Sequence, residues 1–251
     1  MRRLLFSRAM TSFWVAAALA AALNQSPAAP AAASPPNPFR QLFHNLGTDA
    51  KSLASVNSLV IMGVGGAGAI ATKNNADIRA HDWAVKQPKD PGLAQFGNVA
   101  GDGFLQGGLA VATWAIGRQQ QNVRLETTGS DLIRAQVLNG ILTQAIKLTV
   151  NRERPDGGGH AFPSGHASAT FATAAVIQRD YGFAAALPFY GLGGLVSWSR
   201  VRTSHHWVSD VVFGGALGIT SGLAVTKGRP GKWSVTPVKT SGGAAIYFTR
   251  R

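Results

Sequence analysis

The chain has 251 residues, of which 24 are Lys or Arg and 11 are Asp or Glu, so its formal net charge is +13. Hydrophobic residues make up 45% and charged residues 14% of it, which excludes a disordered chain, a coiled coil and a collagen-like repeat. It has no cysteine, which excludes disulfides and a cysteine-based zinc site. The positive charge predicts an anionic partner. Because the basic residues are scattered, we expect no nucleic acid among the partners.

Residues 1–33 are predicted to be an export signal. Arg2 and Arg3 precede an apolar stretch of eleven residues, Phe13–Leu23, and the small residues that end at Ala33 offer a processing site. Eleven apolar residues are too few to span a bilayer comfortably, which favours removal of the segment over a permanent anchor. The sequence therefore predicts export to the cell envelope, with the following domain on the periplasmic side.

Three further regions follow the export signal. Residues 34–50 are predicted to form a proline-rich linker with a short amphipathic helix at Phe39–Gly47. Residues 51–227 form a helical domain, and residues 228–251 form a C-terminal tail. In that tail, two short runs joined by Ser241-Gly242-Gly243 predict a small hairpin, with strands at Trp233–Thr240 and Ala244–Thr249.

The helical domain alternates between apolar stretches and polar connectors, without the period-two pattern of strands. The predicted helices lie at 53–72, 103–117, 130–150, 164–179, 182–199 and 206–226. We therefore expect an all-α fold, a six-helix up-down bundle with a catalytic pocket at one end. Residues 73–102 and 118–131 carry no readable pattern.

Glycine patterns and hydropathy leave two alternatives to consider. Residues 63–68 match the GxGxxG pattern of dinucleotide-binding turns, but no acidic residue follows about twenty positions later, so we interpret them as small residues in a packed helix. None of the six helices is a decisive membrane span: 53–72 comes closest, and 206–226 carries Asp210, which is costly in lipid. Membrane crossing therefore stays open.

Three clusters of polar residues lie in the last four predicted helices and their connections. They are Lys147 with Arg154-Pro155, then Pro163-Ser164-Gly165-His166, then Ser199-Arg200 with His206 and Asp210. The first cluster ends the third helix, the second opens the fourth, and the third joins the fifth to the sixth. In an up-down bundle these three places lie at the same end, so the clusters are expected to form one pocket.

The first chemical property of these clusters is affinity for a phosphoryl group. Lys147, Arg154 and Arg200 supply three cations from separate segments, suited to phosphoryl oxygens. Ser164 and the amide of Gly165 stand at a predicted helix N-terminus, where exposed N–H groups favour an anion.

The second property is proton and nucleophile chemistry. His206 and Asp210 are four residues apart and share one helical face, so the carboxylate can hold the imidazole tautomer. His166 supplies a second imidazole that is able to donate a proton.

Four other basic residues fall outside this pattern. His160 and His205 do not fit the register of the clusters and are expected to be hydrogen-bonded structural residues. Arg152 and Arg202 are expected to be rim or surface charges.

The three clusters resemble the motifs of the type 2 phosphatidic acid phosphatase superfamily, which includes bacterial non-specific acid phosphatases and vanadium haloperoxidases. All three motifs are present in order with the expected internal spacings, and no motif position departs from the pattern. The resemblance covers the 64 residues from Lys147 to Asp210, and the rest of the chain agrees only in being helical.

The resemblance implies a hydrolase of phosphoric esters or anhydrides. His206 would attack phosphorus and form a phosphohistidine, Asp210 would orient it, and His166 would protonate the leaving oxygen and then activate water. The residues that would hold the phosphoryl oxygens are Lys147, Arg154, Ser164, Gly165 and Arg200. No metal or other cofactor is implied.

The implied substrate is a phosphorylated small molecule or lipid: a phosphate monoester or a lipid (di)phosphate. Two alternatives remain open: a vanadate-dependent haloperoxidase, with His206 as the vanadate ligand, and a non-catalytic phosphate- or lipid-binding envelope protein. Membrane contact and oligomeric state stay open as well.

Overall fold

The computed structural model describes residues 38–88, 91–227, 233–240 and 243–250. The predicted export signal at 1–33 and the first residues of the predicted linker lie outside them.

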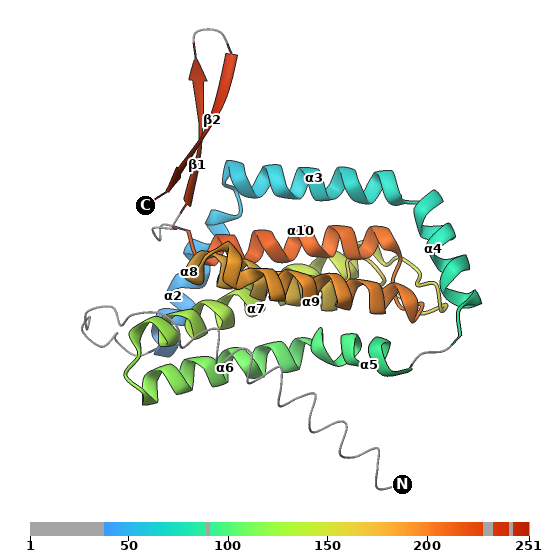
Figure 1. The fold of residues 1–251 in the computed structure, drawn as a ribbon, viewed down its shortest axis with the longest axis horizontal. Helices are drawn as coiled ribbons and strands as arrows, with labels where there is room; N and C mark the ends of the chain where they lie inside the picture. The colour runs from blue at the N-terminus through green and yellow to red at the C-terminus, as the bar shows by residue number, and fades with distance from the viewer. Residues whose placement is uncertain (1–37, 89–90, 228–232, 241–242, 251) are drawn as a thin grey trace, which may run out of the picture.

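The predicted all-α fold is confirmed, since each of the six expected helices has a counterpart in the structure (Figure 1). These six are α3 (Val56–Thr72), α6 (Gly103–Gln119), α7 (Val123–Val150), α8 (Gly165–Tyr181), α9 (Phe183–Arg202) and α10 (Val208–Val225). Their starts follow local capping chemistry. Asp102 accepts the amides of Phe104 and Leu105, and Ser164 accepts the amide of Ala167 at 3.5 Å.

Three more helices stand in the described residues, so the bundle is larger than the six expected. They are α2 (Pro38–Ser52), α4 (Asn75–Lys86) and α5 (Pro91–Ala100). Helices α4 and α5 thus lie in the segment 73–102, for which the sequence shows no readable pattern. Within α4 the buried residues are Asp77 and Ala84, so this helix has no apolar stripe that a sequence pattern could reveal.

The third predicted helix begins seven residues earlier than expected. Asn122 caps α7 by accepting the amide of Leu125 at 3.1 Å, and the helix runs on through Gly129. A Cβ at Gly129 would lie 2.2 Å from the backbone nitrogen of Trp114. This glycine allows α6 and α7 to approach closely and does not mark a turn.

Helices α8 and α10 pack closely at the centre of the bundle, with α3 lying along the other side of α10 (Figure 1). A Cβ at Gly218 would lie 2.1 Å from the carbonyl oxygen of Ser168, and one at Gly65 would lie 2.2 Å from the Cβ of Ala216. The interpretation of residues 63–68 as small residues in a packed helix is thereby confirmed.

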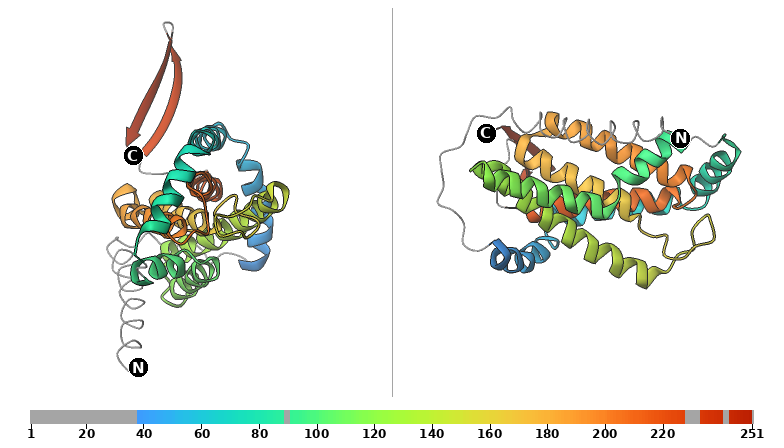
Figure 2. Two further views of the ribbon diagram at one scale, coloured as in Figure 1. Left: turned by 90° about the vertical axis from the view of Figure 1, so that its right-hand side faces the viewer. Right: turned by 90° about the horizontal axis from the view of Figure 1, so that it is seen from below.

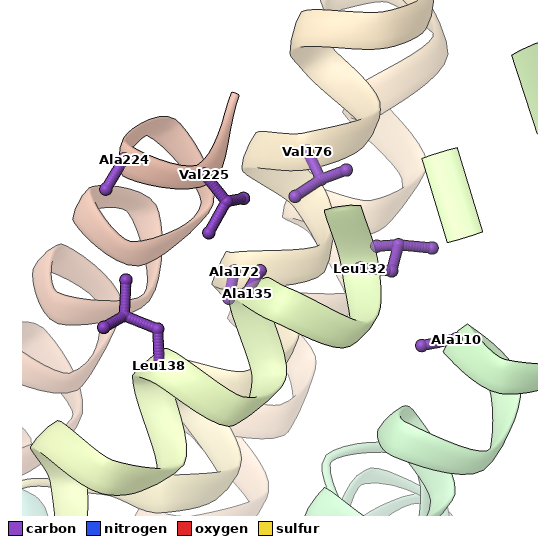
Figure 3. Close-up of a cluster of buried hydrophobic side chains, with 8 residues drawn as sticks. All are labelled: Ala110, Leu132, Ala135, Leu138, Ala172, Val176, Ala224 and Val225. Atoms are coloured by element: carbon purple, nitrogen blue, oxygen red, sulfur yellow. The ribbon is translucent and has the colours of Figure 1, made fainter. Parts of the chain in front are cut away.

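A hydrophobic cluster holds together α6, α7, α8 and α10 (Figure 3). Its members are Ala110, Leu132, Ala135, Leu138, Ala172, Val176, Ala224 and Val225. A buried polar network stands beside it: Arg134 bonds Asp49 at 2.7 Å, Asp131 at 2.5 Å and the carbonyl of Val225 at 2.8 Å. This end of α7 lies about 20 Å from the turn that carries Lys147, at 1.5 Å of rise per residue.

The C-terminal strands form the predicted hairpin. Strand β1 (Trp233–Thr240) pairs antiparallel with β2 (Gly243–Arg250), in a register that sets Trp233 opposite Arg250 and Thr240 opposite Gly243. The hairpin extends away from the helices (Figures 1 and 2).

Two described segments have the length and hydropathy of a membrane span. One is α10, of which 67% is buried within the protein, and the other is the end of α2 together with α3, a pair bent by 60°. A core helix of a soluble protein has the same properties, and α10 lies inside the bundle (Figure 1).

Candidate active site

A pocket of about 420 Å³ opens at the end of the bundle where α7 ends and α8 begins. All three sequence clusters contribute to it. The predicted site residues among those that line it are Lys147, Arg154, Gly165, His166, Arg200 and His206. The expected convergence of the clusters in one pocket is therefore seen in the structure.

The segment after α7 turns back on the helix that precedes it. Asn151 ends α7 in the left-handed conformation, with φ 42°. The side chain of Lys147 donates to the carbonyl of His160 at 2.5 Å, and a ring nitrogen of His160 lies 3.1 Å from the carbonyl of Lys147. His160 thus serves a structural role, and the returning segment carries Arg154 to the pocket.

Helix α8 points its N-terminus at the pocket. Ser164 caps it, and the backbone amide of Ser164 donates to the carbonyl of Asp210 at 3.0 Å. That bond ties the second motif directly to the third. The first turn of α8, with Gly165 and His166, therefore presents its partial positive charge to the pocket.

His206 and Asp210 form the pair that their spacing predicts. The Nδ1 atom of His206 lies 3.4 Å from Oδ2 of Asp210, and both side chains are buried. Burial lowers the pKa of His206 to about 4, against the opposing effect of the bond to Asp210, and the charges of Lys147 and Arg200 lower it further. The ring is therefore neutral at pH 7, as a nitrogen nucleophile must be.

His166 lies in the first turn of α8 and lines the same pocket. Burial lowers its pKa to about 4, with smaller contributions from the charges of Arg200 and His206, while Asp102 acts in the opposite direction. Both imidazoles are thus neutral at pH 7.

The three cations of the pocket, Lys147, Arg154 and Arg200, have hydrogen-bond donors that could bind an anion. Among the described residues none of them forms an ion pair, and the buried Nε atoms of Arg154 and Arg200 have no hydrogen-bond partner there. Burial, followed by the charge of Arg154, lowers the pKa of Lys147 to about 8 and that of Arg200 to about 10. Buried donors that lack acceptors mark a site for an anion.

Two of the predicted site residues lie behind the pocket and do not line it. Ser164 is fully buried, with its hydroxyl at the cap of α8. Asp210 is also fully buried, and its Oδ2 accepts the amide of Trp207 at 2.9 Å. Asp210 thus caps α10 in addition to holding His206.

Three residues that support the site were missed from the sequence. Asn98 on α5 accepts from Arg200 at 2.9 Å, and Asp77 on α4 accepts from Arg152 at 2.7 Å. Arg152 also donates to Asp210 at 2.7 Å, so its interpretation as a rim or surface charge was wrong. The signal for Arg152 was its place within the first motif; Asn98 and Asp77 lie in segments with no readable pattern.

Comparison with known proteins agrees with this geometry. The model of the PAP2 superfamily matches residues 156–234, the stretch that contains the second and third motifs. The match covers about a third of the chain. Lys147 and Arg154 of the first motif precede the matched stretch and join it in the pocket.

A curated relative is the lipid A 1-phosphatase of Porphyromonas gingivalis, 34% identical over 99 residues. The match covers 37% of this chain and 22% of that protein, so the chain spans about a fifth of the length of its relative.

Two solved structures are similar in fold. LpxE of Aquifex aeolicus superposes with a TM-score of 0.52 at 19% identity, over 62% of this chain and 97% of that one. A transmembrane PAP2-type phosphatidylglycerolphosphate phosphatase from Bacillus subtilis gives a TM-score of 0.44 at 17% identity, over 75% and 94% of the two chains. The first of these supports the all-helical fold.

Proposed function

We propose that the protein is a phosphatase that hydrolyses phosphate monoesters or lipid (di)phosphates through a phosphohistidine, without a metal. The observation that carries the proposal is the meeting of two imidazoles, buried His206 and half-buried His166, in a pocket whose cations lack carboxylate partners among the described residues. Such a pocket suits a substrate that brings its own negative charge.

In the first step His206 attacks phosphorus through Nε2, because Nδ1 faces Asp210. The P–N bond forms as the ester P–O bond breaks, and His166 gives its proton to the leaving oxygen. The groups that hold the phosphoryl oxygens in this step are Lys147, Arg154, Gly165 and Arg200, which line the pocket. Ser164, which lies behind the pocket, contributes by capping the helix whose N-terminus faces the phosphoryl group.

In the second step water replaces the leaving group. His166, now without its proton, accepts one from the water, whose oxygen attacks phosphorus while the P–N bond breaks. The products are inorganic phosphate and the neutral ring of His206. One imidazole thus serves as acid and then as base.

The lipid form of the substrate is favoured by the surface around the pocket mouth. Phe104, which lines the pocket at the start of α6, is 93% exposed, and Ile141 on α7 is also exposed. These side chains offer an apolar path for an acyl chain that leaves the pocket. The curated relative, named as a phosphatase of lipid A, supports the same class.

The proposed location is the cell envelope, with the active site on the periplasmic side. The predicted export signal supports this, and exposed apolar residues on α3 supply a surface for membrane contact. The proposal covers membrane attachment and not a particular topology.

The test is turnover of p-nitrophenyl phosphate, phosphatidate, polyprenyl diphosphate and lipid A by purified protein. We expect His206→Ala and His166→Ala each to lose on the order of 10²-fold or more in kcat on the lipid substrates. The matched control is His205→Ala, because His205 is adjacent in sequence but bonds Thr203 and does not line the pocket. Equal turnover in the parent and in His206→Ala would refute the mechanism.

A further inference from the structure

A buried cluster of charges lies behind the pocket, on the side of Asp210 that faces away from the substrate. Arg152 bridges two buried carboxylates: one guanidinium nitrogen is 2.7 Å from Oδ1 of Asp210, and the other is 2.7 Å from Oδ2 of Asp77. Asp210 is 0% and Asp77 2% exposed. The mechanism described above makes no use of this bridge.

Ser209 and Trp207 complete the cluster. The amide and hydroxyl of Ser209 donate to the two oxygens of Asp77 at 2.8 and 2.7 Å, and the same hydroxyl accepts from Arg152 at 2.6 Å. The guanidinium of Arg152 lies 5.4 Å from the ring centre of Trp207. Asp77 therefore fixes both the guanidinium and the first turn of α10.

As a result, both carboxylate oxygens of Asp210 are fixed by hydrogen bonds. Oδ1 accepts from Arg152, while Oδ2 accepts the amide of Trp207 and faces Nδ1 of His206. A carboxylate held in this way has no rotational freedom left. Its orientation toward the imidazole depends on Arg152, which depends in turn on Asp77.

We propose that Arg152, anchored by Asp77, is a positioning residue that holds the carboxylate of Asp210 against His206 and adjusts how strongly the imidazole keeps a proton. The proposal rests on the proposed function for its role in catalysis. Its electrostatic part concerns the protein alone and can be measured without a substrate.

The charged groups near His206 and Asp210 lie on two sides of this pair. On the pocket side His206 is near Lys147 on α7, Arg200 on α9 and His166 on α8. On the opposite side Arg152 forms an ion pair with Asp210, and Asp77 forms an ion pair with Arg152.

The two charges of the bridge act on His206 with opposite signs. Removing the cation leaves a more negative surrounding, which favours the imidazolium and raises the pKa of His206. Without the carboxylate of Asp77, the positive charge of Arg152 is balanced by Asp210 alone. The surroundings of His206 become more positive, which lowers the pKa of His206. A purely structural bridge would reduce stability in both variants and shift the pKa in neither.

The experiment is a titration of ring-¹³C-labelled histidine by NMR, with the His206 signal assigned from His206→Gln. We expect Arg152→Gln to raise the pKa of His206, and Asp77→Asn to lower it, by about half a unit each. The matched control is Arg202→Gln, since Arg202 lies at the same end but donates to the carbonyls of Ala84 and Gln87. We expect it to leave the titration unchanged.

Arg152→Lys separates charge from geometry. It keeps the cation but loses the fork that reaches both carboxylates, so we expect an unchanged pKa of His206 and a several-fold lower kcat on p-nitrophenyl phosphate. If Arg152→Gln fails to fold, the pKa of His206 in Asp77→Asn and the kcat of Arg152→Lys test the proposal without it.

Shifts of the same sign in Arg152→Gln and Asp77→Asn, or no shift in either, would overturn the proposal. So would full kcat in Arg152→Lys. A parent protein that turns over none of the phosphate esters but shows the opposite shifts would refute the phosphatase function and leave the electrostatic assignment standing.

Discussion

His166 and His206 make opposite demands on protonation. In the proposed mechanism the nucleophile His206 must be neutral, whereas His166 must carry a proton to give to the leaving oxygen. Burial lowers the pKa of each to about 4, so at pH 7 His206 is neutral as required and His166 is neutral as well. A phosphate dianion bound beside Arg200 would offset the repulsion and raise the pKa of His166, so the substrate itself supplies the condition for its protonation.

The same two pKa values predict a stability that depends on pH. Each histidine has an ordinary pKa of 6.5 and a folded pKa of about 4, so between these values the unfolded chain binds more protons than the folded one. Stability is therefore full above pH 6.5 and falls as the pH is lowered toward 4. We expect urea unfolding to show a loss on the order of 5 kcal/mol between pH 7 and 4.5 from the two groups together.

The control for this prediction is the double variant His166→Gln/His206→Gln. It should lose less stability over the same pH interval, because it lacks the two groups that the unfolded chain protonates. Parallel curves for the parent and the double variant would show that these histidines titrate alike in both states.

Residue spacing predicted the pair of His206 and Asp210, since four positions on one helix fix their distance. Spacing could not reveal Asn98, which bonds Arg200 across 102 positions of sequence, nor Asp77, which bonds Ser209 across 132. Such partners are chosen by tertiary packing. The wrong interpretation of Arg152 has the same cause, because its two carboxylates come from α4 and α10.

At the scale of elements, the site depends on the close contact of α8 with α10. The second motif begins α8 and the third begins α10, so the distance between these helices sets the distance between His166 and His206. Gly218 allows that approach, since a Cβ there would overlap the carbonyl of Ser168. Helix spacing is thus coupled to catalytic geometry.

Gly218→Ala is therefore expected to destabilise the fold by about 1–3 kcal/mol and to lower kcat, because α10 must move away from α8. Gly194→Ala on α9 is the matched control: nothing lies within 4 Å of its added Cβ, and the substitution should stabilise the helix by up to about 1 kcal/mol. Urea unfolding and turnover of p-nitrophenyl phosphate measure both. A Gly218→Ala variant as stable as Gly194→Ala would contradict this account.

The elements that the sequence revealed were those with long apolar runs and cap residues. Helix α4 was missed because its buried face holds Asp77 and Ala84. The first two turns of α7 were missed because Gly129 and its polar neighbours resemble a turn, although the glycine serves the contact with Trp114. In both cases the residue types are explained by contacts with a neighbouring helix and not by the local structure.

At the scale of the whole molecule, α3 exposes apolar side chains although it packs on α10. Val60 is 57% and Val64 68% exposed, and they lie one turn apart on α3. Exposed apolar groups gathered on one helix indicate a surface for membrane contact.

We expect Val64→Asp to weaken binding to phospholipid vesicles about tenfold, because the apolar contact is lost and a charge is brought to the lipid. Gln119→Glu adds the same charge at an exposed polar position of α6, on the far side of the bundle from α3 (Figure 1), and is the matched control. Vesicle flotation measures binding, and turnover of p-nitrophenyl phosphate should be unchanged in both. Equal binding by the parent and Val64→Asp would exclude this surface.

The fold as a whole brings together residues from Lys147 to Asp210, and in the proposed mechanism phosphate passes to His206 and then to water. The most direct test uses His166→Ala with p-nitrophenyl phosphate, whose leaving group needs no proton, followed by an alkaline quench that preserves phosphohistidine. We predict a burst of about one nitrophenol per active site, and phosphate on the peptide that contains His206 by mass spectrometry. A burst that leaves phosphate on another residue, or turnover with no phosphorylated histidine in either the parent or the variant, would contradict the account.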